Sequence, residues 1–156
     1  MPQTVSLSFY RFSRWQTRLW AFAMMGLARG AMARVPGIGF WKLCGSGTGE
    51  GFTPVPNTAV YAILATWPDE ATARAQTGSA DIFSRYSARA AESWSVFLCP
   101  TSARGNWSGA HPFAVSDANS DGAETGALAA LTRATIKPSV LARFWRRVPD
   151  ISKVIG

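Results

Sequence analysis

The chain has few residues of the kinds that bind metals or form cross-links. Its only cysteines, Cys44 and Cys99, lie far apart and have no CxxC neighbours. Neither a zinc site nor a disulfide framework is expected, and buried free thiols in a reducing cytoplasm are the better prediction. His111 is the only histidine, so a multi-histidine metal site is excluded, and a Ser-His-Asp triad would require His111 as its base. No paired carboxylates stand out for acid–base chemistry.

Long apolar runs are also lacking. The longest uncharged apolar stretch covers residues 19–28 and ends at Arg29, which is too short to cross a bilayer. No small-residue cleavage site closes this stretch as a secretory signal would require. The protein is therefore expected on the cytoplasmic side.

The charged residues are few and mostly of one sign. Charged residues make up 16% of the 156 residues, and the net charge of +7 is carried by thirteen arginines and only three lysines. Such a balance suits an anionic partner, but the chain has no basic run and no nucleic-acid motif, so nucleic acid is not expected. Arginines spread through the apolar segment that contains residues 11–34 instead indicate an ion-paired helix or one that faces a membrane surface.

Hydrophobic periodicity predicts an α+β fold. Residues 4–12 alternate as a strand does, Ser13 is a plausible N-cap for a helix to about residue 34, and residues 38–43 and 59–67 predict two further strands. A second helical region, residues 71–91 with a break near Gly78, precedes a fourth strand at 93–98. This order is that of the ferredoxin-like split βαβ unit, which covers one sheet face and leaves the other needing cover.

The rest of the chain predicts a second, incomplete repeat. Residues 1–99 form the ferredoxin-like unit, residues 100–126 a loop or linker, and residues 127–156 a strand plus a helix that repeat the start of the chain in pattern. A fragment, a natural truncation of a tandem-repeat protein, and a coincidence of common strand-helix units all remain open. Pairing with a second repeat or a second copy would cover the open sheet face.

Two loops are candidate binding sites. Glycines at alternate positions in residues 45–51 let backbone N–H groups approach a ligand, although the spacing fits neither a Walker A loop nor a dinucleotide fingerprint. From the spacing alone, a flexible hairpin loop is the favoured interpretation. In the segment 100–109 (PTSARGNWSG), Arg104 could hold an anion such as a propionate and Trp107 could stack on a flat ring. An ordinary surface loop is the alternative. His111 could serve as a lone haem ligand or be solvent-exposed.

Four blocks occur in order along the chain: FWKL followed by GSGTGEGFTPVPN (residues 40–43 and 45–57), LATWPDEATARA (64–75), AESWSVFLCPTSARGNWSG (91–109) and ALTRATIKPSVLARFW (130–145). Together they resemble the spheroidene monooxygenases, the haem-dependent oxygenases that put keto groups on acyclic carotenoids. The resemblance covers nearly the whole chain and corresponds to the N-terminal part of that family, whose members run well beyond residue 156.

The resemblance implies a haem monooxygenase built on α+β-barrel repeats, with dioxygen as oxidant, reduced ferredoxin as electron donor and a carotenoid as substrate. The two loops are expected to adjoin at one end of the sheet as a cofactor site, with Gly45, Gly47, Gly49, Arg104, Trp107 and His111 as its candidate residues and His111 as the candidate metal ligand. No family haem ligand matches a residue of this chain, and that ligand is expected in the part of the family beyond it. The Trp20, Met24 and Leu27 side of the first helix has two alternative roles: packing on a second repeat or a dimer partner, which is favoured, and peripheral contact with the inner membrane. The alternative is a non-catalytic ferredoxin-like module that binds or dimerises through its open sheet face.

Overall fold

The computed structural model of the protein describes residues 2–48, 55–115, 129–131 and 139. The strands and helices within these residues are β1 (Thr4–Arg11), α1 (Trp15–Leu27), α2 (Arg29–Met32), β2 (Trp41–Gly47), β3 (Pro56–Trp67), α3 (Glu70–Ser79), α4 (Asp81–Arg89) and β4 (Glu92–Leu98). None of these helices is both long and apolar enough to cross a membrane.

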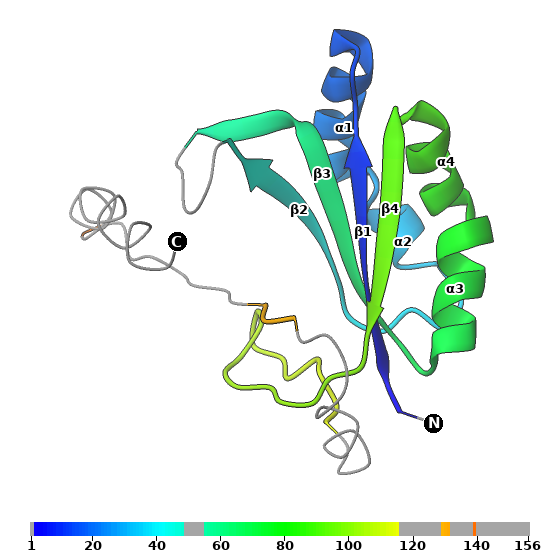
Figure 1. The fold of residues 1–156 in the computed structure, drawn as a ribbon, viewed down its shortest axis with the longest axis vertical. Helices are drawn as coiled ribbons and strands as arrows, with labels where there is room; N and C mark the ends of the chain where they lie inside the picture. The colour runs from blue at the N-terminus through cyan, green and yellow to red at the C-terminus, as the bar shows by residue number, and fades with distance from the viewer. Residues whose placement is uncertain (1, 49–54, 116–128, 132–138, 140–156) are drawn as a thin grey trace.

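The strands form one antiparallel sheet in the order β2-β3-β1-β4, with the helices packed against one of its faces (Figure 1). Two strand-helix-strand units interleave in this way in the ferredoxin-like fold. The predicted fold class is therefore confirmed for the first 98 residues. The predicted second repeat lies almost entirely outside the described residues, and the division at residues 99 and 126 stays a prediction.

The sheet face that packs against the helices contains buried serines. On β1 the alternating residues Ser6, Ser8 and Tyr10 point toward the helices, whereas Val5, Leu7 and Phe9 lie on the other face. The small serine side chains fit beneath the helices because large aromatic rings from neighbouring positions fill the space above them. The Trp67 Nε1 atom donates a hydrogen bond of 2.8 Å to the Ser6 hydroxyl, and the Ser8 and Ser95 hydroxyls lie 2.7 Å apart.

The core between sheet and helices is rich in aromatic rings, as the composition predicts. Phe12 is fully buried and contacts Trp20, Tyr61 and Tyr86 edge-on or tilted, with centroids 6.1 to 6.4 Å apart. On the helix side these rings meet small or flexible residues, which let the helices approach closely: Ala21, Met24, Ala28, Met32 and Ala73. This packing fixes which side of α1 faces the sheet.

Several element boundaries differ from those that the sequence predicts. The N-cap of α1 is Arg14, which offers no side-chain hydrogen bond, so the prediction of Ser13 as cap is wrong. The break between α3 and α4 falls at Ala80, close to the predicted one. β2 begins later than predicted and runs on through Gly45 and Gly47, because these glycines pair with β3 across a bulge instead of leaving the sheet.

Candidate functional site

The glycine loop and the PTSARG segment lie at opposite ends of the sheet, so the prediction that they adjoin is wrong (Figure 1). Gly45 pairs with Tyr61, which lies opposite Tyr10, whereas Leu98 at the end of β4 lies opposite Val5. These two rows are five residues apart along β1, a separation of about 16 Å. The reason is strand direction: β2 runs parallel to β1 and β4 runs against it, so their C-terminal ends point in opposite directions.

The five predicted site residues that the structure describes therefore lie at two ends of the sheet. Gly45 and Gly47 are exposed at one end of the sheet, and Gly49 lies outside the described residues. Arg104 and His111 are exposed at the other end, and Trp107 there is half-buried. Thr48 closes the glycine loop through hydrogen bonds from its backbone N–H and its hydroxyl to the Val55 carbonyl, at 2.9 and 3.2 Å.

The PTSARG segment is fixed to the start of the sheet. The Trp107 ring packs edge-on against Phe40 and Phe113, with centroids 6.3 and 5.4 Å away. Its backbone pairs with Ala110 across a tight turn in which Ser108 and Gly109 both have positive φ, the geometry of a type I′ hairpin. The Gln3 amide holds residues 112 and 114 by two further hydrogen bonds. Trp107 is thus an anchor for the segment.

The sheet face that the helices leave free is almost wholly apolar, and we call it the open face. In register it consists of Val5, Leu7 and Phe9 on β1, Lys42 and Cys44 on β2, Val60, Ala62, Leu64 and Thr66 on β3, and Trp94, Val96 and Leu98 on β4. Its middle is shielded from solvent, with Leu64 only 1% exposed. At its β4 edge Trp94 is 63% exposed and stacks on Phe9, with ring centroids 5.6 Å apart. A face of this kind can hold a flat hydrocarbon or a second apolar surface.

Polar chemistry on the open face comes from the Cys44 thiol, the Lys42 ammonium group and the Thr66 hydroxyl, and the hydroxyl is hydrogen-bonded to the Phe40 backbone. Burial raises the pKa of the Cys44 thiol, and the positive charge of Lys42 partly opposes this rise. Cys44 is half-buried, as a structural thiol would be, but Cys99 is exposed, so the prediction that both thiols are buried is wrong for Cys99. Nowhere in the described ranges do three or more His, Cys, Asp or Glu side chains gather as metal ligands would.

A hollow lies on the helix side of the sheet, beside the free edge of β4, and no sequence motif indicates it. It has a volume of about 320 Å³ and is lined by Tyr10, Arg74, Thr77, Gly78, Ser87, Ser93, Trp94, Ser95 and Phe97. Burial raises the pKa of Tyr10 to about 12, against the effect of hydrogen bonds with Ser8 and Ser87. The Arg74 guanidinium lies over the Phe97 ring at 4.4 Å and is also paired with Glu70. The Tyr10 hydroxyl and the Arg74 guanidinium that line the hollow are therefore engaged in contacts within the fold.

Comparison with known proteins identifies relatives along almost the entire chain, although no family model matches it. It is 47% identical over 154 residues to the spheroidene monooxygenase of Cereibacter sphaeroides, covering 99% of this chain and 47% of that protein. It is 44% identical over 156 residues to the spheroidene monooxygenase of Rhodobacter capsulatus, covering 100% of this chain and 64% of that protein. The chain thus spans about half to two thirds of the length of these relatives.

Solved structures resemble the ferredoxin-like unit at low sequence identity. SnoaB, a cofactor-independent oxygenase from Streptomyces nogalater, superimposes with a TM-score of 0.46 at 11% identity, over 66% of this chain and 97% of that one. By its sequence, the chain is similar to the spheroidene monooxygenases along almost its whole length and corresponds to part of theirs.

Proposed function

We propose that this chain is part of a monooxygenase that oxidises acyclic carotenoids of the spheroidene type to ketones. The observation that supports the proposal is the identity of 47% and 44% to two spheroidene monooxygenases along 99% or more of the chain. Conversion of a methylene group to a carbonyl group takes two successive monooxygenations, each of which inserts one oxygen atom from dioxygen into a C–H bond and releases the other as water, using two electrons and two protons supplied through a donor such as reduced ferredoxin. The gem-diol formed by the second insertion loses water to give the ketone.

In this proposal the open face is the surface against which the carotenoid lies. A carotenoid is long, flat and apolar, and the strands present parallel rows of aliphatic side chains that end in the stacked pair of Phe9 and Trp94. The rings of this pair offer a π surface on which a conjugated chain can stack. Leu64 and Ala62 at the centre are already covered by protein atoms. A polyene would therefore lie on the more accessible side chains toward the β4 edge, Phe9, Trp94 and Val96, which would shield it from water along one side.

The haem that the family resemblance implies does not fit the described residues. His111 is exposed, and the glycines predicted to help hold the group lie at the other end of the sheet from Arg104 and Trp107. We therefore derive no step through haem. The function proposed for the described residues is to bind and orient the substrate and to exclude water. The haem contacts are assigned to residues outside the described ranges or to the part of the relatives that this chain does not span.

A non-catalytic pairing module is the second candidate. It is favoured by the 63% exposure of Trp94 on a face whose centre is dry, since a second sheet laid on the open face would bury that ring. The occupant would be a second copy of the chain or a second repeat. Both candidate functions use the open face, but only the monooxygenase would form keto-carotenoid.

An exchange experiment separates them. A host that accumulates spheroidene and lacks its own monooxygenase would receive the R. capsulatus enzyme with its matching segment replaced by this chain. We expect keto-carotenoid by chromatography and mass spectrometry. Replacing Trp94→Ser in the chimaera should lower the yield, whereas Val55→Ser, a control at another exposed apolar side chain, should leave it unchanged. A chimaera that accumulates to the level of the native enzyme but leaves spheroidene unaltered would favour the pairing module.

A further inference from the structure

Helix α1 is apolar on two sides, and only one of them is buried. Ala21, Met24 and Ala28 face the sheet and are 0%, 4% and 0% exposed. On the opposite side Trp15, Leu19 and Phe22 are 70%, 60% and 66% exposed. The spacing of these three residues places them along one line of the helix surface, which we call the α1 stripe.

The expectation that the Trp20, Met24 and Leu27 side faces outward is wrong for two of its three residues. Met24 is in the core, and Trp20 packs on Tyr86 with Arg89 over its ring, at centroid distances of 5.1 and 4.6 Å. Only Leu27, at 76%, is exposed. The surplus apolar surface of α1 therefore lies on the α1 stripe.

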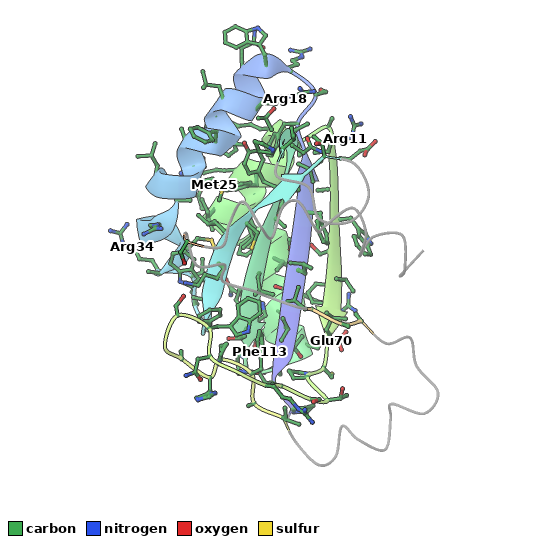
Figure 2. The ribbon with its side chains drawn as sticks, turned by 90° about the vertical axis from the view of Figure 1, so that its left-hand side faces the viewer. Arg11, Arg18, Met25, Arg34, Glu70 and Phe113 are labelled. Carbon is green, nitrogen blue, oxygen red and sulfur yellow. The ribbon has the colours of Figure 1, made fainter. Side chains whose placement is uncertain are left out.

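We propose that the α1 stripe inserts into the interfacial layer of an anionic lipid membrane. The inference rests on α1 and its surroundings and does not depend on the proposed activity. The helix lies on the outside of the molecule, and its outer side chains project away from the sheet (Figure 2). Bulky apolar side chains that project from a helix on the surface of the molecule can enter the boundary between headgroups and acyl chains.

The charges around the α1 stripe indicate that the lipid it contacts has an anionic headgroup. The first 49 residues of the sequence contain no Asp or Glu but five arginines and one lysine, and of these Arg11 in β1 is ion-paired with Glu92. Arg18 comes three residues after Trp15 and four before Phe22, so it lies beside the stripe, and Arg29 continues the line seven residues after Phe22. Arg14, Arg29 and Arg34 are all exposed, and Figure 2 shows Arg34 beyond the C-terminal end of α1. Arginines near an anionic bilayer surface each add to binding.

The same charges disfavour a second copy of the chain as the occupant. A two-fold symmetric contact between two α1 stripes would bring Arg18 and Arg29 of each copy close to those of the other, with no carboxylate from the first 49 residues to neutralise them. An acidic protein would satisfy the arginines but would not by itself account for three large exposed apolar side chains in line. Anionic phospholipid accounts for both features.

The test is flotation of the purified chain with vesicles of phosphatidylcholine, with and without phosphatidylglycerol. We expect salt-sensitive binding to the anionic vesicles and much weaker binding to the neutral ones. The double variant Leu19→Ser with Phe22→Ser should weaken binding at least about tenfold, because two side chains no longer enter the apolar layer. Both residues are exposed, so circular dichroism should show an unchanged fold.

A variant that is expected to bind vesicles more strongly is also needed, because a loss of binding could come from misfolding. Gly26 lies four residues after Phe22 on the same line, and a Cβ atom there would meet nothing within 4 Å. Gly26→Leu should extend the α1 stripe and strengthen vesicle binding about fivefold. Binding that is unchanged in both the Gly26 variant and the double serine variant would overturn the proposal.

A matched pair of charge variants tests the position of the arginines. Arg14→Gln with Arg29→Gln should weaken binding about tenfold. Arg74→Gln with Arg85→Gln on α3 and α4 lowers the net charge equally and should have a much smaller effect. Equal losses in the two pairs would mean that net charge alone attracts the vesicles, which contradicts the proposal. So would a chain that sediments as a dimer and becomes monomeric in the double serine variant without a change in vesicle binding.

Discussion

Phe9 on β1 and Trp94 on β4 lie directly opposite each other in the sheet and stack, with ring centroids 5.6 Å apart and ring planes inclined by 17°. The register of the two strands sets this stack, and it lies on the face that the helices leave free. A stacked pair usually forms within a core, but here the Trp94 ring is 63% exposed. The sheet thus carries a preformed aromatic platform at the edge of an apolar surface.

The hydrogen bond between Trp67 and Ser6 should contribute measurably to stability. Ser6→Ala removes the acceptor of the Trp67 Nε1–H group, and both residues are 1% exposed or less. A buried donor without a partner costs about 1–3 kcal/mol. We expect urea denaturation to show a free energy of unfolding reduced by this amount, with little change for Ser13→Ala at an exposed position. Equal stabilities of the two variants would show that Trp67 does not need this acceptor.

The fold could be predicted from the sequence because its signals are local. Alternation in residues 4–12 and 93–98, and the Pro-Asp-Glu start of the second helical region, depend on near neighbours. The position of the loops required the direction of each strand. In the split βαβ topology β2 and β4 run oppositely, so their C-terminal ends cannot meet, and two motifs that each follow a strand need not share a site.

Burial of the two sides of α1 could not be predicted from periodicity. Both sides are apolar, and the choice between them depends on shape. Ala21 and Ala28 flank Met24 and allow the helix to approach the sheet, whereas Trp15 and Phe22 would hold it away. The buried Ser6 and Ser8 mislead in the same way, because their polarity indicates the solvent side of a strand until Trp67 is placed over Ser6.

Asp69 should make the stability of α3 depend on pH. Its carboxylate accepts a hydrogen bond of 2.7 Å from the Thr72 backbone N–H, and this bond lowers the pKa of Asp69. Because the folded-state pKa is depressed, the contribution is present above the unfolded-state pKa of about 3.9 and is lost as the pH falls through the lower folded-state value.

Asp69→Asn, which retains a capping oxygen, should keep most of the stability at neutral pH and remove this part of the acid dependence. Thermal denaturation midpoints from neutral pH to about pH 3 provide the measurement. Asp69→Ala is the control for loss of the cap at every pH. A steep acid dependence that persists undiminished in the Asn variant would assign the effect to other carboxylates.

His111 should not hold haem in the described part of the chain. The side chain is exposed, and the predicted partner glycines lie at the far end of the sheet. Absorption spectra of the chain with added haem should show the same Soret band, or the same lack of one, in the parent and in His111→Ala. A Soret band present in the parent and lost in the variant would restore His111 as the ligand.

Equilibrium binding of spheroidene to the purified chain in mild detergent, followed through the visible absorption band of the carotenoid, tests the central claim most directly. If the open face holds the substrate, binding should saturate, and Trp94→Ser should weaken it about tenfold through loss of the aromatic contact. The double variant Leu19→Ser with Phe22→Ser, on the other side of the molecule, should bind spheroidene as the parent does. Binding that does not saturate, or that is indifferent to Trp94 but lost in the α1 variant, would contradict the assignment of the open face as the carotenoid site.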